Sequence, residues 1–234
     1  MRKVLITLLV ITFSYFAVAQ DREKGSPDLP GDLIVNIGVN NLTNRADTMR
    51  TQAFGSKSFG IYYTNRIAIS PRFSFYPAIG ITSEKYQFDE DILLETDAEG
   101  VTTFRDLSEI GDIDKNRLAV NYIELPVEFR FHPWRTSDGS GFFIGVGGSV
   151  GVRVESHTKL VYSDGELDLT EKQRNSYNLS TVRYGLLGRV GFRGINAFCR
   201  VYFSDLFSAG NLPSPVDDSL NPNSFTVGIS FNAF

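Results

Sequence analysis

The sequence predicts an all-β fold, an eight-stranded antiparallel barrel in which each strand pairs with the next one along the chain. Three observations favour this class. Eight segments alternate between apolar and polar residues with a period of two, the period of a strand with one buried face. Turn-forming residues separate these segments, and the connections are alternately long and short. The eighth segment ends the chain, where most proteins have frayed polar residues.

The alternation justifies each expected strand in turn. Apolar residues occupy every second position, as Val35 and Ile37 do in the first strand and Val127 and Phe129 do in the fourth. Glycines take many of the positions between them, as in the fifth and sixth strands. The expected strands cover residues 33–40, 58–67, 72–88, 118–131, 142–154, 182–192, 197–207 and 224–234.

Two prolines, Pro77 and Pro126, lie inside expected strands. A closed barrel has no free edge that would tolerate the missing N–H group. We therefore expect a bulge or a local break in the hydrogen-bond ladder at each proline.

The connections predict where the two ends of the barrel lie. In an up-and-down arrangement alternate connections fall at the same end, so the long loops share one end and the short turns share the other, together with both termini. Short periplasmic turns, long extracellular loops and an even strand number are typical of transmembrane barrels of the outer membrane. The long connections are 41–57, 89–117, 163–181 and 208–223, and the short ones are 70–71, 132–141 and 193–195.

Composition alone does not distinguish a membrane barrel from a soluble sandwich. The charged residues on the polar face of the strands favour the membrane barrel. Eight strands enclose a space that side chains can fill, so interlocked charges would plug the lumen, and the glycines would make room for them. Glu155 also falls on the polar face. We expect a lumen charge network, and no open pore, from Glu124, Glu128, Arg130, Arg153, Arg183, Arg189 and Arg200.

The N-terminus has the build of a secretory signal peptide. A basic start, Met1–Lys3, precedes an apolar run, Val4–Val18, and Ala17–Ala19 gives a small-residue cleavage site. The alternative, a membrane anchor, needs about 20 apolar residues, and this run is shorter. We expect a signal peptide at 1–19, a periplasmic segment at 20–31 and the barrel at 32–234. With one cysteine no internal disulfide forms, and the net charge of −4 gives no nucleic-acid footprint.

The last strand carries a pattern that barrel assembly machinery reads. It resembles the polar-x-Gly-x-x-apolar-x-apolar signal of outer-membrane strands, followed by a terminal aromatic residue. That aromatic residue is out of phase with Phe225 and the apolar positions that follow it. The residues of the expected signal are Thr226, Gly228, Phe231, Ala233 and Phe234.

A family resemblance rests on four stretches. Residues 121–131 read NYIELPVEFRF and resemble the NYLEIPLELRF strand of the PorT-like outer-membrane β-barrel family, often labelled the porin family. Residues 144–159, 183–192 and 221–229 resemble later strands of that family. The resemblance implies an outer-membrane barrel. Because the family covers many uncharacterised barrels, it implies no activity, and the secretion role tied to PorT itself is one alternative.

Two patterns could carry chemistry, and each has a plainer interpretation. Gly145–Gly151 looks like a phosphate loop, but such a loop needs a following helix, so glycines within a strand are favoured. His157 beside Ser156 could serve a rim-located enzyme, but neighbours in a strand point to opposite faces. We therefore expect no enzyme and no cofactor.

The second long loop is acidic, with ten Asp or Glu residues against two basic ones between Phe88 and Asn116. Divalent cations could bind there, but a solvated loop is the plainer interpretation because a full ligand spacing is missing. We expect hairpins in which 92–96 pairs with 101–105 and 159–162 pairs with 166–170.

The sequence thus predicts a structural or loop-displaying outer-membrane barrel. The alternatives are a narrow channel for small solutes and an accessory role in protein secretion. Expected partners are outer-membrane lipid or lipopolysaccharide, the barrel assembly machinery and an extracellular partner of the long loops. We expect a monomer.

Overall fold

The computed structural model describes residues 31–134, 141–163, 167–192, 194–217 and 220–233. The expected signal peptide and all but the last residue of segment 20–31 lie outside these residues, so both stay predictions. Among the residues that the structure describes, no helix is long and apolar enough to cross a membrane.

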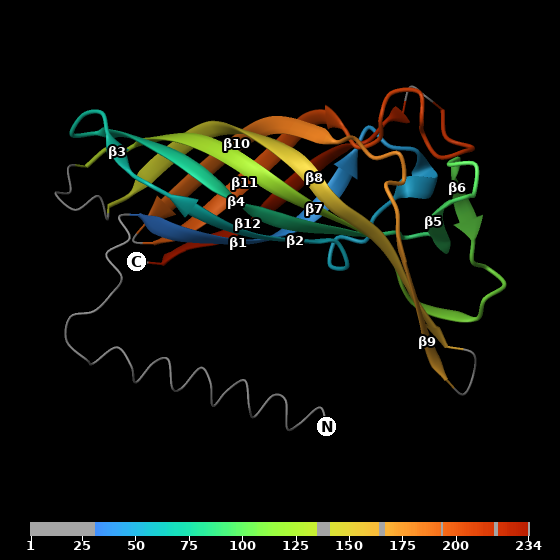
Figure 1. The fold of residues 1–234 in the computed structure, drawn as a ribbon. Coiled ribbons are helices and arrows are strands. Elements are labelled where there is room, and N and C mark those ends of the chain that lie inside the picture. Colours follow the sequence, from blue (N-terminus) through green and yellow to red (C-terminus); the bar gives the residue numbers. More distant parts are fainter. Residues whose placement is uncertain (1–30, 135–140, 164–166, 193, 218–219, 234) are drawn as a thin grey trace. The chain divides into compact units, whose positions relative to one another are not determined.

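Eight antiparallel strands form a closed barrel (Figure 1). Each strand pairs with the next along the chain, and β12 pairs with β1 to close the sheet. The predicted fold class is therefore confirmed. The barrel strands are β1 (Asp32–Thr43), β2 (Lys57–Thr64), β4 (Phe73–Gln87), β7 (Asp112–Phe131), β8 (Phe143–Ser163), β10 (Val182–Phe192), β11 (Ile195–Asp205) and β12 (Asn223–Ala233).

The two ends of the barrel differ as predicted. At one end β1 begins, β12 ends and the short connections lie, with the two-residue strand β3 (Ile67–Ala68) beside β4 (Figure 1). The long loops gather at the other end, where the remaining short elements also lie. They are the 3-10 helix η2 (Asp47–Met49), β5 (Ile92–Thr96), β6 (Thr102–Asp106) and β9 (Asp168–Arg174).

Both expected hairpins are present in the long loops. β5 pairs with β6 from Thr96 opposite Thr102 to Ile92 opposite Asp106. β9 pairs with the far half of β8, up to His157 opposite Arg174, so this ribbon is longer than expected. Residues 163–165, which join the two expected strands of this ribbon, lie partly outside the described residues.

The prolines interrupt a ladder without shifting its register. Between β4 and β7 the pairing stops after Pro77 opposite Val127 and resumes at Gly80 opposite Glu124, in the same register. The expected local break is therefore present, and neither proline forms a bulge in this pairing. The register between β7 and β8 shifts at two other places on β7. One shift lies between Ile113 and Lys115, and the other lies between the neighbours Asn121 and Tyr122.

The second of these shifts corrects the placement of Glu155. Asn121 pairs with Glu155, but the next residue, Tyr122, pairs with Arg153, so Val154 is the extra residue of a bulge on β8. A bulge exchanges the faces of the strand beyond it. Arg153 therefore faces the lumen, whereas Glu155 faces outward.

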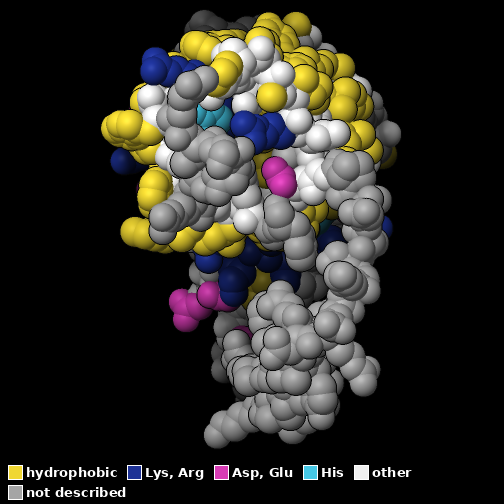
Figure 2. Space-filling view, turned by 90° about the vertical axis from the view of Figure 1, so that its left-hand side faces the viewer, with side chains coloured by type: hydrophobic (Ala, Val, Ile, Leu, Met, Phe, Trp, Pro, Cys, Tyr) yellow, Lys and Arg dark blue, Asp and Glu magenta, His cyan; other side chains and the backbone are white. Residues whose placement is uncertain are grey.

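The two faces of the wall have opposite chemistry. Most inward positions in the middle of the barrel are polar or aromatic and buried, whereas most outward positions there are aliphatic or aromatic and open, as Ile81 at 60% and Val146 at 63% exposure show. Seen from the short-turn end, hydrophobic side chains cover much of the outer wall (Figure 2). A soluble sandwich would turn this apolar face inward. This wall turns it outward.

Candidate functional site

The carboxylate of Glu124, on β7, stands at the centre of the lumen with no exposed surface. Its Oε1 accepts hydrogen bonds from Arg183 Nε at 2.9 Å and Tyr202 Oη at 2.6 Å. Its Oε2 accepts from Tyr62 Oη and Thr82 Oγ1, each at 2.7 Å, and from Arg200 Nη1 at 2.9 Å. The strands β2, β4, β10 and β11 therefore all bind one carboxylate on β7, which ties opposite walls together.

Arg183 extends this network toward the long-loop end. Its Nη1 lies 2.8 Å from Glu84 Oε2, and its Nη2 lies 2.7 Å from Glu124 Oε1. Its guanidinium stacks 3.4 Å from the ring centre of Tyr122 and 4.2 Å from that of Tyr202. One arginine thus bridges two buried carboxylates between two aromatic rings.

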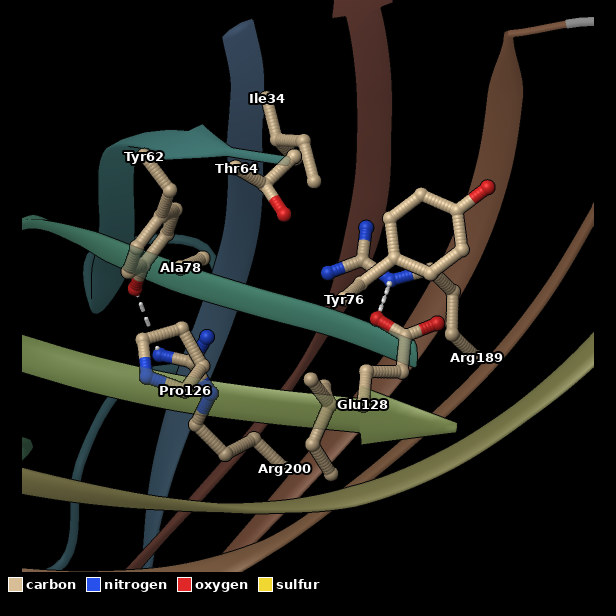
Figure 3. Close-up of a pocket in the computed structure, with 10 residues that line it drawn as sticks. Ile34, Tyr62, Thr64, Tyr76, Ala78, Pro126, Glu128, Arg189 and Arg200 are labelled. Atoms are coloured by element: carbon tan, nitrogen blue, oxygen red, sulfur yellow. Dashed lines mark hydrogen bonds and ion pairs between the residues drawn. The ribbon is translucent and has the colours of Figure 1, made fainter. Parts of the chain in front are cut away.

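Glu128 forms a second layer nearer the short-turn end. Its oxygens pair with Arg130 Nε at 2.7 Å and Arg189 Nε at 3.1 Å. Arg130 also lies 3.9 Å from the ring centre of Tyr76 and 4.3 Å from that of Phe143. Figure 3 shows the Glu128–Arg189 pair, with Arg200 hydrogen-bonded to Tyr62 nearby. The cavity between the two layers measures about 10 Å³, roughly the space of one water molecule.

Glycines on β8 make room for these carboxylates. A Cβ at Gly145 would lie 2.2 Å from Glu128 Oε1, and one at Gly151 would lie 2.9 Å from Glu124 Cγ. Both contacts are shorter than non-bonded atoms tolerate. The glycines of the stretch that resembled a phosphate loop therefore belong to a strand that accommodates lumen charges.

The structure brings together all but one of the residues expected in the network. Among the described residues, no carboxylate forms an ion pair with Arg153. Arg153 lies within hydrogen-bond distance of the Leu179 and Ser180 carbonyls and of Ser156 Oγ. Glu84 and the tyrosines Tyr62 and Tyr202 were missing from the expected set. All three occupy the polar face of their strands, so the alternation that identified the other members also points to them.

An apolar core closes the long-loop end of the lumen. Inward residues of the strands, such as Tyr86 and Leu118, pack with loop residues such as Met49 and Phe207. We call this packed region the loop cap. Its buried members are Leu42, Met49, Tyr86, Phe88, Leu94, Leu118, Val120, Tyr122, Tyr177, Leu179, Leu206 and Phe207.

A smaller cluster and one ion pair support the loop cap from the side. Leu93, Leu107 and Leu160 join the β5–β6 hairpin to β8. Arg105 Nη1 lies 3.0 Å from Glu95 Oε1, and this hydrogen bond raises the pKa of Arg105. The acidic loop is therefore a folded hairpin. Within the described residues, no group of three His, Cys, Asp or Glu side chains could hold a metal ion.

His157 and Ser156 lie apart, as the strand geometry predicts. Ser156 is buried, and its Oγ donates to the carbonyl of Asn175. His157 Nδ1 lies 3.4 Å from Glu155 Oε1, which also pairs with Arg174 Nε at 3.1 Å. The serine therefore cannot be activated by this histidine.

The last strand forms the seam of the barrel. Thr226 faces inward and donates to Asn40 Oδ1 at 2.8 Å, whereas Phe231 faces outward between Val35 and Ile195. A Cβ at Gly228 would lie 2.2 Å from the Ile37 carbonyl oxygen, so β1 and β12 approach closely there. Ala233 pairs opposite Leu33, and the expected terminal aromatic, Phe234, lies outside the described residues.

Comparison with known proteins gives one family match. The profile described as "Outer membrane protein beta-barrel domain" matches residues 19–207. No curated protein has a detectably similar sequence.

Solved structures give weak likenesses. Ail, the attachment invasion locus protein of Yersinia pestis, was solved alone and with the heparin analogue sucrose octasulfate. The complex is 9% identical, with a TM-score of 0.35, and the match covers 87% of this chain and 97% of that one. A triple mutant of the Rhodopseudomonas blastica porin is 10% identical, with a TM-score of 0.20, and covers 87% and 99%.

Proposed function

Because this chain belongs to the outer membrane protein β-barrel domain family, we propose that it is a non-conducting barrel that presents its long loops for interactions outside the cell. Family membership places the protein in the outer membrane. The outward apolar wall then faces lipid. The long-loop end faces the exterior, as short periplasmic turns and long extracellular loops are arranged in such barrels.

The observation that carries the proposal is the filled lumen. Among the described residues, four arginines and three glutamates are at most 4% exposed, and the cavity beside them admits about one water molecule. The apolar core of the loop cap lies beyond them. A permeating ion would have to displace paired charges and a packed core in succession.

Planar-bilayer recording of the purified, folded protein tests the proposal. We expect no steady conductance from the wild type. Because the loop cap would still close the lumen, the folded variant must weaken both barriers. E124A/R183A/R200A combined with L94A should pass measurable current, whereas R153A should stay silent because Arg153 binds two loop carbonyls and Ser156 rather than the central carboxylates. A large steady wild-type conductance would mean that the barrel is a channel.

The display role has its own test. Protease added to intact cells should cleave within the long loops and spare the barrel strands. Loops that resist cleavage in intact cells but not in lysed cells would contradict the orientation.

Two finer functions remain as alternatives. A narrow channel for small solutes is tested by the same recordings. A PorT-like role in protein secretion predicts that deletion of this chain stops the export of other proteins. No contact of the described residues favours either one.

A further inference from the structure

Five cationic side chains lie together on one outward wall, near the long-loop end of the strands, which faces the exterior in the orientation proposed above. Cross-strand pairing places Lys57 opposite Lys85, Arg117 opposite Lys159, and Lys159 opposite Lys172. Arg117 also lies two residues along β7 from Ala119, the partner of Lys85. The five residues therefore form one continuous group across β2, β4, β7, β8 and β9, which we call the cationic rim.

The composition of this rim is electrostatically unfavourable by itself. Directly opposite side chains have Cβ atoms about 5 Å apart, and like charges at such positions are destabilising. Three such pairs occur here. No carboxylate among the described residues forms an ion pair with any of the five. The outward carboxylate nearby in register, Glu155, is bound by Arg174, His157 and Asn121.

The position of the rim relates it to the membrane. The outward row Val35–Ile61–Ile81–Ile123–Val152 is wholly apolar. Lys85 lies four residues beyond Ile81 on β4, so two strand repeats, roughly 13 Å, separate it from that row. The intervening outward positions are less apolar, as Ser83 and Asn121 show. The apolar band of such barrels is about 25 Å tall, so we expect the rim to lie near the boundary between lipid headgroups and hydrocarbon.

The rim is confined to one side of the barrel. The outward positions of β10, β11, β12 and β1 carry no Lys or Arg among the described residues, whereas the arginines of β10 and β11 face inward. A general attraction to the membrane surface would be served by cations all around the wall. A one-sided cluster fits a ligand that docks at a single place.

We propose that the cationic rim binds the phosphate groups of an anionic lipid in the outer leaflet. Phosphate oxygens accept charge-assisted hydrogen bonds from lysine and arginine, and they would relieve the repulsion within the rim. The acyl chains of the same lipid would lie along the apolar residues below, on β4, β7 and β8. A free phosphate ion would satisfy the cations without using this apolar surface. The adjacency of the two surfaces therefore favours a lipid.

Native mass spectrometry of the full mature protein in a neutral detergent tests the proposal. The probe is bisphosphorylated lipid A in mixed micelles, compared with the same lipid after removal of its phosphates and with inorganic phosphate alone. The test variant is K85Q/K159Q. The matched control, R50Q/R72Q, removes the same charge from two exposed residues outside the rim. A conservative variant, K85R/K159R, keeps the charge.

We expect the wild type, the control and the conservative variant to retain the phosphorylated lipid. K85Q/K159Q should bind it on the order of tenfold more weakly, since each membrane-facing cation contributes appreciably to binding anionic lipid. The proposal is overturned if the dephosphorylated lipid binds as well as the phosphorylated one, or if K85Q/K159Q equals the control. Retention of inorganic phosphate without lipid would also overturn it. If the double variant lacks the heat-dependent gel shift of a folded barrel, the single variants K85Q and K159Q are measured instead. Each must then bind the phosphorylated lipid more weakly than the wild type, by less than the tenfold expected for the double variant.

Discussion

The lumen of the barrel and the loop cap bury different kinds of side chains. In the middle of the barrel many buried side chains are acidic or basic, as Glu124 and its arginine partners show, and most of the apolar residues lie on the outside. In the loop cap the buried groups are apolar, and the charged pair Arg105–Glu95 is partly exposed. Lipid accepts only an apolar outer wall, so the remaining residues of each strand face inward. The loops are surrounded by water, so the loop cap buries apolar side chains, as a soluble protein does.

The largest effect should come from removing the central carboxylate. Glu124→Ala removes the carboxylate that pairs with the buried charges of Arg183 and Arg200. Removing one partner of a buried ion pair costs about 3–5 kcal/mol of folding free energy. The urea midpoint of the heat-modifiable folded band should fall strongly. An unchanged midpoint would show that water solvates the lumen, which would also weaken the case for a plugged barrel.

A core truncation in the loop cap should act locally. Leu94→Ala removes a fully buried side chain from the cap, at a cost of about 2–5 kcal/mol to the packing there. We expect faster protease cleavage of the loops while the barrel keeps its gel shift. Loss of the gel shift would show that cap and barrel unfold as one unit.

A single methyl group tests how tightly the lumen is packed. Gly145→Ala places its Cβ against the Glu128 carboxylate and should cost about 1–3 kcal/mol through overpacking. The matched control is Gly188→Ala on β10, where a Cβ would meet no described atom within 4 Å. Both change one strand glycine, so equal urea midpoints for the two variants would contradict the predicted crowding.

The smallest effect should come from the exposed ion pair. Glu95→Gln removes the nearer carboxylate partner of Arg105, whose Nη1 also lies 3.5 Å from Glu171 Oε2. A pair open to solvent contributes about 0.2–1 kcal/mol. Urea unfolding of the barrel should be unchanged, and protease cleavage of the β5–β6 hairpin should rise only slightly. A loss as large as that of Glu124→Ala would remove the distinction between the two regions.

Much of this arrangement was predictable because a strand repeats every two residues. The alternation identified the eight strands, the face of Glu124 and Glu128, and the β5–β6 hairpin. It failed at Glu155, because one extra residue at Val154 exchanges the faces and nothing in the local pattern marks it. It also could not give the partner of Arg153, which binds carbonyl groups of the loop before β10. The loop cap depends on contacts between distant loops, which no periodicity records.

The seam between the first and last strands has a consequence for biogenesis. Thr226 and Asn40 meet there although 186 positions separate them in the chain, whereas the other barrel pairings join consecutive strands. Closing so long a loop is entropically costly and slow. Until β12 arrives, the growing sheet has an open edge that can recruit other chains. We therefore expect the pairing of β12 with β1 to be a slow step of folding, and a chaperone that shields the unpaired edge of the sheet should raise the yield of folded protein.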